Sequence, residues 1–296
     1  MSNILTLPGS FFVGANYWAS HAGTAMWREW RPDVVERDLR TLSAEGLQVL
    51  RVFPLWPDFQ PLTQLYSGHG RPVEIRHGED ALPDTEAGRA GVSTEMMRRF
   101  AEFTRLAARY DLKLIVGLLT GWMSGRLFVP PALEGRNPIT DPVSIQWQLR
   151  LVQCVVKRFR NHPAVAAWDL GNECNCMGSA TREQAWTWTA AIVNAIRAND
   201  PTRPVVSGMH GLRMGPGDAW TIQDQAELTD LLTTHPYPYF TPHCDQDPIV
   251  TLRPSLHSTV ESCYYGDIGN KPCLVEEIGT LGPMFGSEPV AAAFLR

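Results

Sequence analysis

The amino-acid sequence predicts an α/β fold, a TIM (β/α)8 barrel that forms a single domain over residues 1–296. Short apolar runs alternate with amphipathic helical patterns along the chain, which is typical of βαβ units and a parallel sheet. Seven such units in one chain favour a barrel over an open sheet. The length of 296 residues suits one large barrel or two ordinary domains, and no repeat or low-complexity linker divides the chain.

Each predicted strand is a short apolar run between turn residues, as expected for strands buried on both faces. The seven runs lie at residues 11–17, 48–53, 112–119, 164–168, 204–207, 231–234 and 273–276. Helices are predicted where apolar residues recur in steps of three and four. One begins near Asp33, after Pro32, and others cover the periodic stretches 96–110, 145–159 and 185–196.

Three long irregular stretches, 54–93, 120–142 and 236–252, each follow a predicted strand. In a barrel such loops lie at the C-terminal face, where active sites are built. The first loop holds aromatic and histidine residues among many Pro and Gly, which is more typical of a binding loop than of a linker. Val73 and Ile75 alternate with polar neighbours, which predicts a small extra hairpin in this loop.

Two of the predicted strands end in glutamates. The fourth strand ends in the motif W-D-L-G-N-E, which closes with Asn172 and Glu173, and the seventh lies in K-P-C-L-V-E-E-I-G, which contains Glu276 and Glu277. A carboxylate and an amide at the end of a buried strand are costly to bury unless they have a function. Two glutamates at the ends of two strands are the residues that hydrolysis of a glycosidic bond requires.

These two motifs, in this order and spacing, resemble glycoside hydrolase family 5 and its relatives among the retaining (β/α)8 enzymes. The resemblance extends from Gly14 to Gly279. It implies that Glu173 is the general acid/base and Glu277 the nucleophile. Glu173 would then need a raised pKa to protonate the leaving oxygen. Asn172 would hydrogen-bond the sugar 2-hydroxyl.

The same resemblance implies roles for three further polar residues. Arg51, at the end of the second strand, would keep the nucleophile ionised. Tyr237 would hydrogen-bond Glu277, and His235, two residues earlier, would line the sugar site near the acid/base. Each has a structural alternative, a buried ion pair for Arg51 and a satisfied core residue for His235. His210, after the fifth strand, is a weaker candidate.

Strand alternation allows only one of Glu276 and Glu277 to point into the barrel mouth. The family pattern favours Glu277, so Glu276 is expected to face the helix layer and to pair with an arginine or a backbone donor. Three tryptophans that follow the first three strands, Trp18, Trp56 and Trp122, are candidate platforms for sugar rings, although packing is the commoner role of tryptophan.

For the substrate, β-mannosidic bonds of oligosaccharides are favoured, with no metal or organic cofactor. Three features resemble the β-mannosidase and β-mannanase branches of the family. They are the G-A-N-Y-W segment ending at Trp18, the F-P-L-W-P-D-F-Q-P segment from Phe53, and the absence of the histidine that commonly follows strand three in the family. The alternative substrate is a β-glucan or β-glucoside, as for a cellulase-like enzyme. A non-catalytic carbohydrate-binding barrel is the rival from another class, and the intact pair of glutamates argues against it.

Composition argues against several other partners. The net charge of −5 gives no attraction to nucleic acid or an anionic membrane surface, and no apolar run approaches about 20 residues. The first ten residues lack the pattern of a signal peptide, so a cytoplasmic location is expected. Six cysteines in a chain this long do not indicate a disulfide framework. Cys174 and Cys176, even with His243 and Cys244, are not a strong zinc spacing.

The barrel is expected to be C-terminally incomplete in this chain. Only 17 of the 296 residues follow Gly279, and Ser287-Glu288-Pro289 begins a helix within them. No sequence remains for an eighth strand and its helix. A further C-terminal segment is therefore expected to complete the barrel and to cover the edges of strands one and seven.

Overall fold

The computed structural model of the protein describes residues 5, 9, 11–215, 217–240, 248, 251–280 and 286–296. Seven parallel strands of this described part follow one another in space as they do in the chain. They are β1 (Gly14–Tyr17), β2 (Val49–Val52), β6 (Lys113–Gly117), β9 (Val165–Asp169), β10 (Val205–Val206), β11 (Leu232–Thr234) and β12 (Cys273–Val275). A single bridge between Val206 and Leu231 joins β10 to β11. This order is that of a (β/α) barrel, as predicted.

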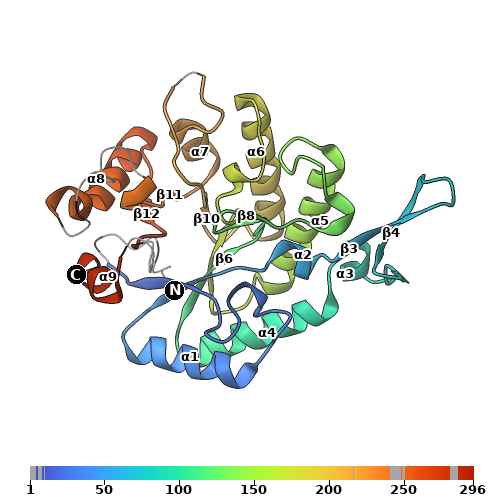
Figure 1. The fold of residues 1–296 in the computed structure, drawn as a ribbon, viewed down its shortest axis with the longest axis horizontal. Coiled ribbons are helices and arrows are strands. Elements are labelled where there is room, and N and C mark those ends of the chain that lie inside the picture. The colour runs from blue at the N-terminus through green and yellow to red at the C-terminus, as the bar shows by residue number, and fades with distance from the viewer. Residues whose placement is uncertain are drawn as a thin grey trace.

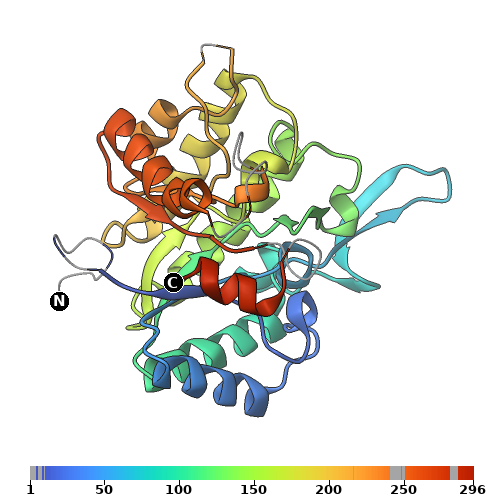
Figure 2. The ribbon, with the colours of Figure 1, turned by 60° about the vertical axis from the view of Figure 1, so that its left-hand side comes forward.

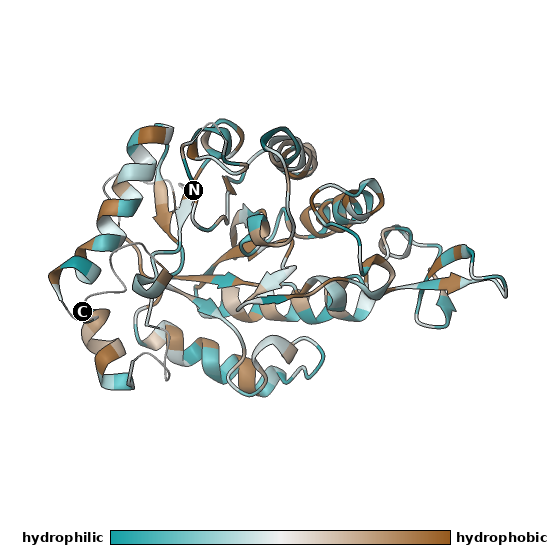
Figure 3. Ribbon diagram, turned by 45° about the horizontal axis from the view of Figure 1, so that its top comes forward, coloured by the Kyte–Doolittle hydropathy of each residue, from teal (hydrophilic) through white to brown (hydrophobic). Residues whose placement is uncertain are grey.

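Helices lie around the outside of these strands (Figures 1 and 3). They are α1 (Pro32–Ala44), α4 (Thr94–Arg109), α5 (Pro142–Phe159), α6 (Arg182–Asn199), α7 (Ile222–Leu228), α8 (Leu252–Gly269) and α9 (Glu288–Phe294). Four of them begin at N-caps whose side chains, Ser93, Asp141, Thr181 and Thr221, accept a backbone N–H three residues later. The predicted helices are present, and α7 and α8 are additional.

The barrel strands separate two apolar layers. The inner layer fills the space between the strands and includes Val49, Ile115, Ala167, Val206, Leu231 and Leu274. The outer layer lies between strands and helices and includes Leu50, Val52 and Leu114. Along β2 the alternation therefore turns Val49 and Arg51 inward and their neighbours outward. Parity along each strand thus decides which polar side chains reach the barrel interior.

Small sheets and helices occupy the predicted loops. β3 (Leu62–Tyr66), β4 (Pro72–His77) and β5 (Asp80–Ala81) form an antiparallel sheet that projects from the barrel, so the hairpin predicted there is confirmed (Figure 1). β7 (Trp122–Met123) and β8 (Arg126–Leu127) pair in the loop after β6. The short helices α2 (Trp56–Phe59) and α3 (Glu86–Arg89) lie before and after the projecting sheet in the chain.

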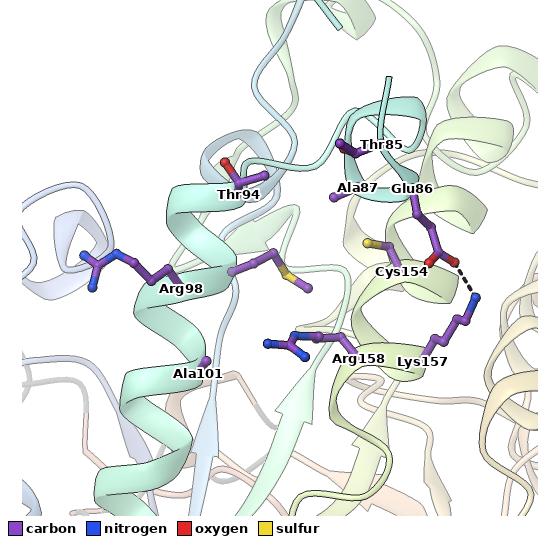
Figure 4. Close-up of a pocket in the computed structure, with 10 residues that line it drawn as sticks. Thr85, Glu86, Ala87, Thr94, Arg98, Ala101, Cys154, Lys157 and Arg158 are labelled. Carbon is purple, nitrogen blue, oxygen red and sulfur yellow. Dashed lines mark hydrogen bonds and ion pairs between the residues drawn. The ribbon is translucent and has the colours of Figure 1, made fainter. Parts of the chain in front are cut away.

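A cavity of about 640 Å³ opens in the helix layer, with α3, α4 and α5 around it (Figure 4). Its lining includes Arg98 of α4 and Cys154 of α5, and an ion pair of 2.6 Å joins Glu86 to Lys157 at one side. None of the residues that line this cavity lies at the carboxyl ends of the barrel strands. The cavity is therefore separate from the expected active site.

The first and last barrel strands are the open edges of the sheet. No hydrogen bond joins β1 to β12 among the residues that the structure describes, and a cavity of about 90 Å³ is lined by residues of both strands. α9 lies near β1 in Figures 1 and 2. Among the described helices, none has the length and apolar character needed to cross a membrane.

Candidate active site

One buried arginine organises the carboxyl ends of the strands. Arg51 of β2 is 3% exposed, and its Nε donates to Asp169 Oδ2 at 2.8 Å. Its Nη1 donates to Asn172 Oδ1 at 2.9 Å and to Glu277 Oε1 at 2.8 Å. A planar guanidinium with five N–H groups can serve several acceptors at once. Arg51 thus connects the end of β9 with the segment that follows β12.

Glu277 lies at the mouth of the barrel and receives two hydrogen bonds. Besides Arg51, the phenol of Tyr237 donates to Glu277 Oε2 at 3.1 Å. Burial and the charge of Glu277 raise the pKa of Tyr237, so this hydroxyl remains a donor at neutral pH. Both expected contacts of Glu277 are therefore present, and both favour its ionised form.

Glu173 is held in an unusual backbone conformation just after β9. Its φ of 46° and ψ of 46° are left-handed, and its backbone N–H donates to Gly208 O at 2.8 Å. Gly171, two residues earlier, has a φ of 151°, and a Cβ there would lie 2.1 Å from the carbonyl oxygen of Leu119. Non-glycine residues in this region are costly and cluster at functional sites. With this backbone, the carboxyl of Glu173 lies near Nδ1 of His235, as does the carboxyl of Glu277.

His235, at the end of β11, lies between two carboxylates. Its Nδ1 is 2.9 Å from Glu173 Oε1, and its Nε2 is 3.1 Å from Glu276 Oε2. The side chain of His235 is 0% exposed, so it contacts Glu173 as expected but presents no surface of its own to a sugar. The ring is therefore fixed by a hydrogen bond on each side.

Glu276 differs from the sequence-based expectation. It does not face the helix layer: it pairs with Arg51 Nε at 3.1 Å and with His235, and its side chain is 1% exposed. The expected pairing with an arginine is present, but on the inner side of the barrel. The reason is parity, because Leu274 belongs to the inner apolar layer and Glu276 is two residues farther along.

The two candidate catalytic carboxylates converge on one atom. Nδ1 of His235 lies 2.9 Å from Glu173 Oε1 and 3.8 Å from Glu277 Oε2. These two oxygens can therefore lie no farther apart than the sum of the two distances, about 6.7 Å. Retaining glycosidases place their carboxyl groups about 5–5.5 Å apart and inverting ones about 6.5–9.5 Å apart. This upper bound includes the retaining separation and excludes all but the shortest inverting separations.

The pKa of Glu173 is not raised, as was expected for a general acid/base, but lowered. Burial raises the pKa of Glu173, but the hydrogen bond from His235 and the charges of His235 and His210 outweigh it, so the pKa lies below its ordinary value. Burial alone would lower the pKa of His235. The carboxylates of Glu277, Glu173 and Glu276 instead raise it to about 10. In the unliganded site the proton therefore resides on the imidazole.

Of the three candidate platforms, Trp56 is excluded. It is fully buried, and its Nε1 donates to Gln60 Oε1 at 2.9 Å, because α2 turns the indole into the core. Trp18 and Trp122 are partly exposed. Trp18 stacks on Phe53 at 5.3 Å, and the backbone oxygen of Trp122 accepts from Asn172 at 3.0 Å. The platform role of these two stays a prediction.

Possible metal ligands also meet here. One atom each from Glu173, His210 and His235 lie within 4.8 Å of one another. The Glu173–His235 separation is that of a hydrogen bond, so we assign the group to proton chemistry, and the absence of a metal stays a prediction. His243 and Cys244 lie outside the described residues.

Sequence reasoning missed one member of the site, Asp169, and gave another, His210, only as a weaker candidate. Asp169, fully buried in the W-D-L-G-N-E motif, accepts from Arg51 and from the backbone N–H of Gly171. Burial raises its pKa to about 7 despite the charge of Arg51. His210 lies 3.6 Å from Glu173 Oε1, and its Nδ1 is buried without a hydrogen-bond partner. A charged residue at an inward position of β9 is the signal that points to Asp169.

A parallel barrel sheet with an arginine and two glutamates at its carboxyl end defines the TIM-barrel scaffold of glycoside hydrolases. Comparison with known families agrees with this class. Residues 132–231, which include Glu173, match the family model described as Glycosyl hydrolases family 2, TIM barrel domain.

The relatives found by sequence are mannanases. Mannan endo-1,4-beta-mannosidase A of Podospora anserina is 25% identical over 266 residues, 83% of this chain and 64% of the relative. The enzyme of the same name from Hypocrea jecorina is 31% identical over 229 residues, 74% of this chain and 47% of the relative. The chain thus spans less than two thirds of the length of these relatives.

Solved structures show the same fold. The exo-beta-1,4-mannosidase Op5Man5 from Opitutaceae bacterium strain TAV5 superposes with a TM-score of 0.71 at 26% identity, over 96% of this chain and 48% of that one. GH5_18 from Streptomyces cattleya, in complex with GlcNAc, gives 0.79 at 21% identity, over 95% and 64%. The homologues are therefore mannosidases, mannanases and family 5 structures, which confirms the resemblance drawn from the two motifs.

Proposed function

We propose that this chain is the catalytic barrel of a retaining β-glycoside hydrolase that cleaves β-mannosidic bonds of oligosaccharides. The observation that carries the proposal is the convergence of Glu173 and Glu277 on His235 Nδ1, at 2.9 and 3.8 Å. A binding protein has no need of two opposed carboxylates. The mannanases and the exo-β-mannosidase among its relatives support the choice of mannosides over β-glucosides.

In the first step Glu277 attacks the anomeric carbon while the bond to the leaving oxygen breaks. The proton held between Glu173 and His235 passes through the Glu173 carboxyl to that oxygen. In the second step Glu173 takes a proton from water, whose oxygen attacks the anomeric carbon and releases Glu277. Arg51 and Tyr237 would keep Glu277 ionised throughout, and Asn172 would bind the sugar 2-hydroxyl. These residues need no metal or organic cofactor for either step.

Aryl β-glycosides test the proposal directly. The full-length protein is expected to hydrolyse aryl β-mannosides faster than β-glucosides and β-galactosides. Proton NMR of the product should show that the β-anomer forms first, as retention requires. A first product of α configuration would exclude retention. Binding of mannan fragments without turnover would support a carbohydrate-binding barrel, and a preference for β-glucosides would support the cellulase-like alternative.

We further propose that a segment outside this chain completes the domain. The support is local: β1 and β12 share no hydrogen bond in the described residues, and α8 exposes Leu252, Leu256 and Val260 on one side. Unpaired strand edges and apolar stripes of this kind are normally covered. A protein extended beyond residue 296 should resist urea better than residues 1–296 alone. Equal stability of the two would contradict this.

A cytoplasmic location is the last part of the proposal. The five cysteines among the described residues, Cys154, Cys174, Cys176, Cys263 and Cys273, are free thiols, as is usual in a reducing compartment. Fractionation of the source cells against cytoplasmic and secreted marker proteins would test it. Recovery in the secreted fraction would contradict it.

A further inference from the structure

Glu276 is a buried carboxylate that the mechanism above does not use. Its side chain is 1% exposed, so it can neither attack a sugar nor protonate one. Its Oε1 forms an ion pair of 3.1 Å with Arg51 Nε, whose hydrogen is directed at Asp169. A carboxylate enclosed in this way is costly unless its partners require it.

A direct line of hydrogen bonds leads from Glu276 to the acid/base. Glu276 Oε2 is 3.1 Å from His235 Nε2, and Nδ1 on the other side of the ring is 2.9 Å from Glu173 Oε1. An ionised carboxylate only accepts hydrogen bonds, so Nε2 must carry the hydrogen. Nδ1 is then left for Glu173, as a donor to the carboxylate or as an acceptor from the protonated carboxyl.

We propose that Glu276 is a positioning residue, which fixes the orientation and tautomer of His235 and thereby makes Glu173 competent as an acid. The inference rests on the proposed function. With Nε2–H committed to Glu276, one proton can move between His235 Nδ1 and Glu173 Oε1 without any rotation of the ring. Carboxylate–imidazole pairs fix the tautomer in the same way at other sites.

The variant Glu276→Gln keeps the shape of the side chain but reverses the direction of its hydrogen bond with His235 Nε2. The amide nitrogen of Gln can donate to Nε2, which forces the hydrogen of a neutral ring onto Nδ1. Nδ1–H then donates permanently to Glu173 and holds its carboxylate ionised. Protonation of the leaving group should therefore fail, while attack by Glu277 should not.

Two substrates separate these steps. A phenyl β-mannoside needs a proton on its leaving oxygen, whereas a 2,4-dinitrophenyl β-mannoside releases its anion unaided. In Glu276→Gln we expect kcat/KM, which reports the first step, to fall about 10²-fold or more for the phenyl glycoside. For the dinitrophenyl glycoside we expect less than about a tenfold loss. Glu173→Gln should show the same pattern, and Glu277→Gln should lose both activities.

Glu276→Asp, which keeps the carboxylate, should recover part of the activity toward the phenyl glycoside. Equal losses on both substrates in Glu276→Gln, or no loss on either, would overturn the role of Glu276 while the proposed function stands. A wild-type protein that turns over neither mannoside would overturn the proposed function as well.

A measurement on the wild-type protein keeps the test independent of how the variant folds. Nitrogen-15 spectra of the imidazoles should show a hydrogen on Nε2 of His235, assigned with the variant His235→Gln. A wild-type ring protonated on Nδ1 alone would contradict the inference, whatever the activity.

Discussion

Replacing Arg51 by alanine removes the shared cation from three buried carboxylates. Asp169 and Glu277 each accept a hydrogen bond of 2.8 Å from Arg51, and Glu276 lies 3.1 Å from its Nε. Among the described residues, His235 is the other cationic partner of this group. Loss of Arg51 therefore leaves more negative charge than one imidazolium can balance, in a region closed to water.

Removing one member of a buried ion pair costs about 3–5 kcal/mol of the free energy of unfolding. The cost should depend on pH. Without the charge of Arg51, which lowers the pKa of Asp169, burial raises that pKa further in the folded variant, so the folded chain binds more protons than the unfolded chain. Its stability then falls as the pH rises, by about 1.4 kcal/mol per pH unit for each carboxyl that stays protonated. We expect Arg51→Ala to cost more at pH 8 than at pH 5.

Arg182→Ala is the matched control. Arg182 donates to both oxygens of Asp224 at 2.7 and 2.8 Å, but its side chain is 43% exposed. An exposed pair is worth about 0–1 kcal/mol, and its loss should matter equally at pH 5 and pH 8. Urea denaturation of wild type and both variants at the two pH values measures the costs. The reasoning is refuted if the two variants lose the same stability, or if the cost of Arg51→Ala grows toward acid pH.

Three further predictions concern the surroundings of the catalytic pair. Trp56→Ala should cost about 3–5 kcal/mol in urea denaturation with KM unchanged, whereas Trp122→Ala should raise KM several-fold at nearly constant stability. Tyr237→Phe should lower kcat/KM about tenfold in steady-state kinetics, because Glu277 loses a hydrogen bond worth about 1.5 kcal/mol. The pKa of His235 is raised to about 10, so its stabilising effect is complete below its unfolded pKa of about 6.5 and is lost as the pH rises through 10. The stability lost in His235→Gln, followed by urea denaturation from pH 6 to 10, should shrink over this range, and a constant difference would contradict the assignment.

The barrel could be predicted because its strands are short apolar runs and most of its helices carry apolar residues in steps of three and four. α8 was missed for a physical reason. It carries Leu252, Leu256 and Val260 on an exposed side, and the described residues that it buries are Pro254 and Tyr265. A helix whose apolar residues do not face the sheet gives no inward stripe to read. α7, with seven residues, is too short for the pattern to repeat.

The contacts of Glu277 with Arg51 and Tyr237 could be predicted from the family resemblance, and they agree with the position of all three at the carboxyl ends of barrel strands, which meet at one face. The pKa of Glu173 could not be predicted in this way. It depends on the 2.9 Å contact with His235, and a contact between residues 62 positions apart is set by the final packing of side chains. The left-handed backbone of Glu173 and the close approach of Gly171 to the carbonyl of Leu119 are likewise features of the final packing.

The inward orientation of Glu276 could have been predicted by counting the strand alternation from a different residue. Counting from Leu274, which packs inside the barrel, alternation turns Glu276 inward as well. Counting back from Glu277 gives the opposite answer and is invalid, because the hydrogen-bonded ladder of β12 extends only to Glu276, whose backbone N–H donates to Thr234 O at 3.1 Å, and alternation does not continue beyond it. Both glutamates therefore reach Arg51, one from within the barrel and one from its mouth. Depth favours Glu277 for the proposed nucleophile, since a nucleophile must touch the sugar: the side chain of Glu277 keeps 11% of its surface exposed and that of Glu276 only 1%.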